Sequence, residues 1–172
     1  MLKSVFTLIV FFLTSACNGN LVEVELAGRA EMRKKAELTE KDFILQSEAL
    51  KKAIVKTPYS ALIKVTSVDI FDMPDSDKSD DYAEQKLTYH AKVIESYRGK
   101  ADRNITYVMY IEKGEDVGHP KEAFIITLCQ SRNGLFWPGV GASFSSDYRL
   151  RELARKHSKQ FSNQQSSFED CE

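Results

Sequence analysis

The sequence has 172 residues, of which 42% are hydrophobic and 28% are charged, and its formal net charge at pH 7 is −1. This composition is typical of a folded domain and excludes collagen-like and wholly disordered chains. A surface for nucleic acid is not expected, because such surfaces need an excess of positive charge.

Residues 1–16 have the layout of an export signal. Lys3 gives a basic start, the apolar run over 5–13 follows, and small residues come next. The apolar run is too short to span a bilayer, which takes about 20 residues. We therefore expect residues 1–16 to be removed as a signal peptide.

The end of this leader, LTSAC over residues 13–17, resembles the lipobox of bacterial lipoproteins, whose cysteine is diacylated and becomes the mature N-terminus. The resemblance implies lipidation at Cys17. It also implies an outer-membrane protein facing the periplasm, because Asn18 stands where Asp would favour the inner membrane. The alternative is a plain secretory signal cut after Ala16, which gives a soluble periplasmic or secreted protein.

The next segment, residues 17–38, is predicted to be a lipid-anchored tether, since charges of both signs alternate along much of it. The folded domain is expected over 39–172. It begins with a helix over 40–56, for which Thr39 offers an N-cap and which Pro58 ends. The apolar face of this helix consists of Phe43, Leu50, Ala53 and Ile54.

Strands follow the helix. In residues 60–70 the apolar positions change parity, which predicts a β-bulge near Thr66 and Ser67. Strict alternation over 87–93 predicts a half-buried strand. Two further strands, expected over 105–111 and 122–130, are apolar on both parities.

The chain then turns at Asn133-Gly134, a strong hairpin signal, and one or two short strands are expected within 135–145. A final helix begins after Ser146 or Asp147 as its N-cap. Its apolar stripe consists of Leu150, Leu153, Ala154, His157 and Phe161.

These elements predict a mainly β fold with flanking helices, in the α+β class. The expected architecture is a small antiparallel OB-like barrel with an N-terminal helix and a C-terminal helix. Trp137 is expected near one mouth of the barrel, and His90 should face water. The expected barrel core consists of Ile63, Val65, Leu87, Tyr89, Val93, Ile125 and Leu128.

Three stretches of this predicted barrel, residues 59–66, 89–99 and 122–126, resemble the strands of the netrin-like module that is shared with tissue inhibitors of metalloproteinases. The resemblance implies an OB-fold. The inhibitors of that family chelate a protease zinc through an N-terminal cysteine anchored by a C-x-C motif. Here Asn18 and Gly19 follow Cys17, so that mode of inhibition is not expected.

Cys129 and Cys171 are left as an even pair if Cys17 carries lipid. In an oxidising compartment such a pair predicts a disulfide. The alternative is two unpaired thiols, with Cys129 acting as a small buried hydrophobic residue.

No catalytic motif, metal-ligand spacing or cofactor fingerprint was found, so no catalytic residue, metal or cofactor is expected. The acidic segment 69–81 departs from the EF-hand pattern; a loose calcium site and a solvated loop are the alternatives. Phe136 and Trp137 are the candidate binding residues, although a tryptophan packing the barrel end is the competing interpretation. The basic side chains of the final helix predict a solvated outer face, or contact with anionic headgroups.

The resulting hypothesis is a lipid-anchored envelope protein that acts as a non-catalytic binding module for a protein or glycan. The partners expected are the membrane, through the lipid, and an unknown envelope protein, but no nucleic acid. An inhibitor that blocks an envelope or foreign protease through surface loops is a second hypothesis. An enzyme whose site is dispersed in the sequence is a third.

Overall fold

The computed structural model describes residues 38–73, 84–100, 102–161 and 171. The predicted signal peptide, the lipidation site Cys17 and nearly all of the predicted tether lie outside the described residues. So does most of the acidic segment 69–81.

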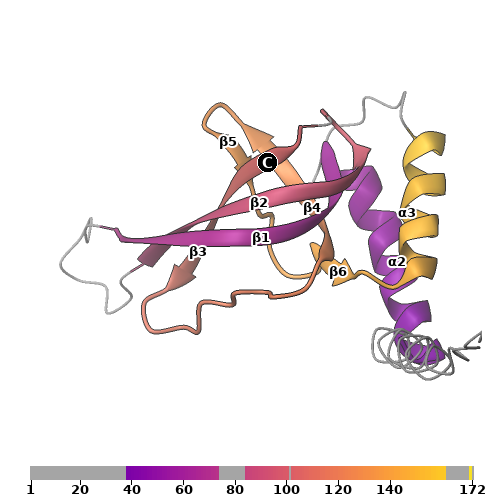
Figure 1. Ribbon diagram of the computed structural model, residues 1–172, viewed down its shortest axis with the longest axis horizontal. Helices are drawn as coiled ribbons and strands as arrows, with labels where there is room; N and C mark the ends of the chain where they lie inside the picture. Colours follow the sequence, from indigo (N-terminus) through magenta and orange to yellow (C-terminus); the bar gives the residue numbers. More distant parts are fainter. Residues whose placement is uncertain (1–37, 74–83, 101, 162–170, 172) are drawn as a thin grey trace, which may run out of the picture. The chain divides into compact units, whose positions relative to one another are not determined.

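Five strands form a closed barrel (Figure 1). Around the barrel the order is β1-β2-β3-β5-β4, and β4 pairs again with β1. The pairings are antiparallel, apart from the parallel pair β3 and β5. A short strand, β6, extends the sheet beside β4. The prediction of a small OB-like barrel is confirmed. The strands are β1 (Tyr59–Asp72), β2 (Glu84–Arg98), β3 (Asn104–Glu112), β4 (Phe124–Ser131), β5 (Gly134–Phe136) and β6 (Ser143–Ser145).

The predicted bulge lies in β1. Val65 pairs with Ala91 and Ser67 pairs with His90, so Thr66 is the extra residue on the β1 side. A bulge bends its strand and increases its twist. β1 pairs with β2 along most of its length and with β4 at its beginning, which closes the barrel, and two further register shifts with β2 lie within that first part of the strand.

One helix precedes the barrel and one follows it: α2 (Glu40–Lys56) and α3 (Tyr148–Gln160). The side chain of Thr39 caps α2 by accepting a hydrogen bond from the Asp42 amide at 3.2 Å. Asp147 caps α3 in the same way. Both helices were predicted from local signals, and the two pack against each other.

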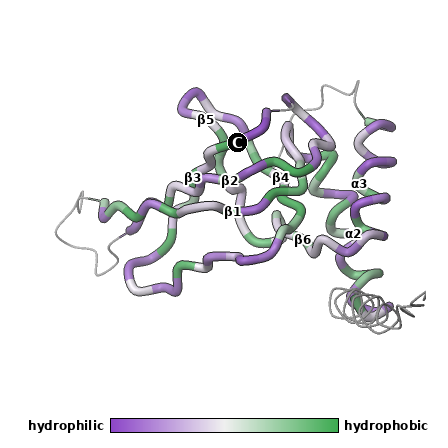
Figure 2. The backbone as a smooth tube through the Cα atoms, viewed as in Figure 1, coloured by the Kyte–Doolittle hydropathy of each residue, from purple (hydrophilic) through white to green (hydrophobic). Residues whose placement is uncertain are grey.

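The apolar residues form two cores, because β4 has the barrel on one side and the helices on the other. Figure 2 shows hydrophobic colour along β4 and on the nearby helices. Most of the predicted barrel core is confirmed, and Val93 packs at its margin. The prediction for Ile125 is wrong, because Ile125 lies in the second core, against the helices. Successive residues of a strand point to opposite faces, so a strand buried on both sides supplies both cores. The barrel core contains Tyr59, Ala61, Ile63, Val65, Leu87, Tyr89, Ala91, Ile105, Tyr107, Ile126 and Leu128.

The arginines of α3 do not form the predicted solvated face, because they bind carboxylates of neighbouring elements. Arg155 donates to Glu95 of β2 at 2.7 Å, and Arg151 also reaches that carboxylate. Partial burial opposes ionisation of Glu95, but these arginines outweigh it and hold its pKa below the ordinary value. The helix is thereby fixed to the barrel.

Asp147 connects the beginnings of the two helices. Its carboxylate is fully buried and accepts hydrogen bonds from the Leu38 amide at 3.0 Å and from the Arg149 amide at 2.8 Å. Burial opposes ionisation, yet these bonds and the Arg149 guanidinium keep its pKa below the ordinary value. Arg149 also reaches Glu40 at 3.0 Å. The charge is satisfied within the fold, which ties α2 to α3.

Cys129 and Cys171 lie at disulfide distance, with Cα atoms 5.3 Å apart, and they are separated by 42 positions in the sequence. Cys129 is fully buried in β4. The predicted pair is therefore brought together, and the bond links β4 to the chain beyond α3.

Candidate functional site

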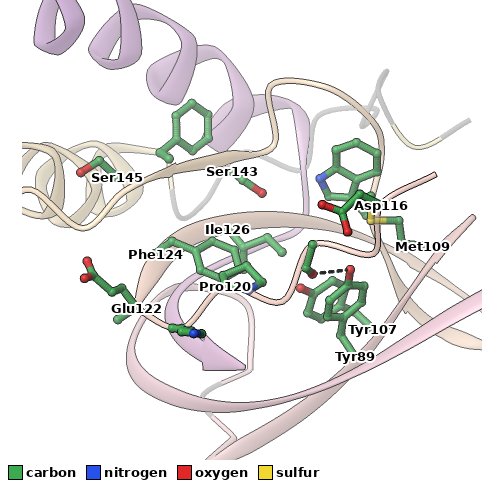
Figure 3. Close-up of a pocket in the computed structure, with 15 residues that line it drawn as sticks. Tyr89, Tyr107, Met109, Asp116, Pro120, Glu122, Phe124, Ile126, Ser143 and Ser145 are labelled. Atoms are coloured by element: carbon green, nitrogen blue, oxygen red, sulfur yellow. Dashed lines mark hydrogen bonds between the residues drawn. The ribbon is translucent and has the colours of Figure 1, made fainter. Parts of the chain in front are cut away.

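A pocket of about 660 Å³ opens beside the connection between β3 and β4, residues 113–123 (Figure 3). Its walls come from β2, β3, β4 and β6, from that connection, and from Trp137 just after β5. They are mostly aromatic and apolar. The lining includes Tyr89, Tyr107, Met109, Asp116, Gly118, Lys121, Glu122, Phe124, Ile126, Trp137, Ser143 and Ser145.

The shortness of β5 explains why the barrel is accessible here. β5 pairs with β3 only at Tyr107 and Val108, and with β4 over residues 129–131. Beyond these pairs β3 and β4 are no longer bridged by β5. Met109 and Phe124 stand on the two sides of the opening, and both line the pocket. The topology thus leaves a window into the barrel interior.

Two tyrosines form one wall of the pocket. Tyr89 and Tyr107 are cross-strand partners, and their rings stack with centroids 4.9 Å apart and planes 5° apart. Burial raises the pKa of both hydroxyls above the ordinary value for tyrosine. The Tyr89 hydroxyl donates to the carbonyl oxygen of Gly118 at 3.0 Å, which fastens the connection to the barrel wall.

The two nominated binding residues have different positions. Trp137 lines the pocket, and its amide donates to the Val108 carbonyl at 2.9 Å. It is half-buried and packs against the barrel core, which is the packing position that was one of the two alternatives, while its role in binding stays a prediction. Phe136 of β5 pairs with Cys129 of β4 and with Val108 of β3, and it is not among the residues that line the pocket.

Sequence reasoning did not nominate the other lining residues as binding residues. Tyr89 was expected in the core because of its parity, and it is buried there, but its hydroxyl also reaches the wall of the pocket. Asp116 carried no signal, since an acidic residue in a glycine-containing connection is normally solvated. Only the fold brings the connection back over the barrel.

The outer face of the sheet holds a separate polar group. His90 Nε2 lies 2.9 Å from a carboxylate oxygen of Asp69, and Nδ1 lies 3.3 Å from the Thr106 hydroxyl. The His90 and Asp69 side chains are 41% and 54% exposed. Thus His90 faces water, as predicted, and the contacts link three neighbouring strands.

Among the described residues, no group of three or more His, Cys, Asp or Glu side chains is arranged to hold a metal ion. Within the same ranges, no helix is both long enough and apolar enough to cross a membrane. A comparison with known proteins finds no protein-family model that matches the chain and no curated protein with significant similarity.

Proposed function

We propose that this chain is a lipid-anchored binding module of the bacterial cell envelope, and that the pocket beside β3 and β4 holds part of a protein or glycan ligand. The observation that carries the proposal is the pocket itself. Its volume of about 660 Å³ lies in the usual range for ligand sites, and such sites combine apolar walls with a few polar groups.

The pocket has the rigidity that a binding site needs. Stacking holds Tyr89 against Tyr107, and the hydrogen bond from Tyr89 to Gly118 holds the 113–123 connection against the barrel. The wall that contains Trp137 lies within the segment closed by the disulfide. A preformed site loses less conformational entropy when a ligand binds, so more of the contact energy contributes to affinity.

The polar groups lie where they could select a ligand. Ser143 and Ser145 of β6 offer hydroxyls on one wall, while Lys121 and Glu122 lie on the exposed connection. In Figure 3 the serines of β6 lie across the pocket from the tyrosine pair. The site therefore has an aromatic side and a polar side, as expected for a binding module.

A blocking substitution tests this proposal. Ser143→Tyr places a ring on an exposed strand position of the pocket wall, and we expect it to lower capture of the ligand from envelope extract by about tenfold or more. Ser67→Tyr is the matched control, because Ser67 is an exposed strand serine outside the lining. Capture by immobilised protein is quantified by mass spectrometry.

Equal capture by the Ser143→Tyr and Ser67→Tyr proteins would contradict a role for the pocket. The captured partner could be a protease that the protein inhibits equally well with and without Ser143→Tyr. That result would favour the inhibitor hypothesis over the binding module. Chemical conversion of the captured ligand would favour the enzyme hypothesis.

Membrane attachment is tested separately. Cys17→Ser is expected to move the protein from the membrane fraction to the soluble fraction and to abolish labelling with radioactive palmitate, since stable anchoring depends on the acyl chains. Cys171→Ser should keep the label and serves as the cysteine control. A Cys17→Ser protein that stays with the membranes would show that another feature attaches it.

A further inference from the structure

We infer that the group held in the pocket is cationic, namely a lysine or arginine side chain of a protein partner. This inference rests on the proposed function and names the class of its ligand. It is drawn from the hydrogen-bonding character, the rings and the charges of the lining residues.

The end of the pocket near Gly118 is rich in hydrogen-bond acceptors. The Tyr89 hydroxyl uses its one hydrogen on the Gly118 carbonyl, so its oxygen can only accept further bonds. Asp116, two positions before Gly118 in the same connection, also lines the pocket, and its solvent-exposed carboxylate is purely an acceptor. In Figure 3 Asp116 lies on the side of Met109 and the tyrosine pair. Ammonium and guanidinium groups are purely donors, so they complement this end.

Trp137 adds an attraction of the same sign. It lines the pocket and is only half-buried, and aromatic faces attract cations through the ring quadrupole. The effect grows when the cation is partly desolvated, as it is in a pocket. A carboxylate ligand would meet both the ring face and Asp116 unfavourably.

The remaining wall fits the aliphatic stem of such a side chain. Met109, Phe124 and Ile126 supply apolar surface beside the acceptor-rich end. Lysine and arginine bury their methylene groups along apolar surface while the charged head keeps polar partners. A sugar ring would instead need partners for hydroxyls on several sides, whereas this wall offers none and the Ser143 and Ser145 hydroxyls lie on the opposite side of the pocket.

The two carboxylates that line the pocket, Asp116 and Glu122, differ in their position. Asp116 and Glu122 are acidic, and Lys121 lies between them in the sequence. In Figure 3 Glu122 extends away from the tyrosine pair, at the far end of the pocket from Asp116. Asp116 is therefore the residue that we assign to the cation.

The test uses the single tryptophan of the chain as its reporter, because Trp137 lines the pocket. The probes are capped pentapeptides of four glycines around a central lysine, arginine, norleucine or glutamate, titrated into the full-length protein in detergent. We expect saturable changes in fluorescence, with a Kd for the cationic peptides about fivefold or more below that for the norleucine peptide. Added salt should reduce this preference.

Asp116→Asn should reduce the preference for lysine and arginine over norleucine, because it removes the carboxylate charge and leaves the Trp137 ring and the Tyr89 hydroxyl oxygen in place. Glu115→Gln is the matched control, because Glu115 is an exposed acid of the same connection that lies outside the lining, and it should retain the preference.

Three outcomes would overturn the inference: equal binding of the norleucine peptide, an unchanged preference in Asp116→Asn, or saturation by chitin oligosaccharides but by none of the peptides. The proposed function survives each of these outcomes if Ser143→Tyr still lowers the capture of a ligand from envelope extract. If no probe saturates and capture is also insensitive to Ser143→Tyr, both fail.

Discussion

Cys171→Ser is expected to lower the free energy of unfolding by about 4 kcal/mol, the value that loop-closure entropy assigns to a cross-link across about 40 residues. The two cysteines are 42 positions apart, and the closed segment contains β5, β6 and α3. Without the cross-link the unfolded chain gains conformational freedom. The segment between Cys129 and Cys171, which carries Trp137, is also no longer closed by a cross-link.

The measurement is a guanidinium titration of the oxidised protein and of the Cys171→Ser variant, both with Cys17→Ser so that no third thiol exchanges. Reductant should lower the midpoint of the parent protein to near that of the variant, and should leave the variant unchanged. Two thiols that react with an alkylating reagent in the native, unreduced parent would show that the bond is not formed in solution.

Leu87→Ala is expected to cost about 3 kcal/mol, within the range for a buried leucine that leaves a cavity. Leu87 is 1% exposed in the barrel core. His90→Ala, three positions further along β2, should cost only about 0.5 kcal/mol, because its contacts with Asp69 and Thr106 lie on the solvent-exposed face of the sheet.

Urea titrations of both variants measure this difference. The comparison is matched, since both changes truncate a side chain of one strand to alanine. Equal destabilisation by Leu87→Ala and His90→Ala would mean that the register of β2 is wrong. A loss for Leu87→Ala below about 1 kcal/mol would mean that the barrel core is not packed as described.

Local signals in the sequence were enough for most of the elements. The cap at Thr39, the change of parity around Thr66 and the Asn133-Gly134 turn each act within a few residues. Such features depend on backbone geometry and on short-range hydrogen bonds, so they can be recognised without knowing the rest of the fold. The pairing of Cys129 with Cys171 was predicted on the further assumption that Cys17 carries lipid, which leaves two cysteines in an oxidising compartment.

The sequence did not reveal which side of a doubly buried strand faces which core. Ile125 and Ile126 are both apolar and both buried, yet one packs against the helices and the other inside the barrel. Period-two reasoning separates an apolar face from a polar one, and it has no contrast to use when both faces are apolar. The position of α2 and α3 decides the assignment.

The sequence by itself determined most of the elements and their order, and it favoured the pairing of Cys129 with Cys171. The tertiary structure decided the site. The pocket exists because β5 is too short to bridge β3 and β4, and because the 113–123 connection folds back to the Tyr89 hydroxyl. Likewise, Arg155 meets Glu95 only when α3 packs on β2. These contacts join residues far apart in the chain, and their geometry follows from the closure of the barrel.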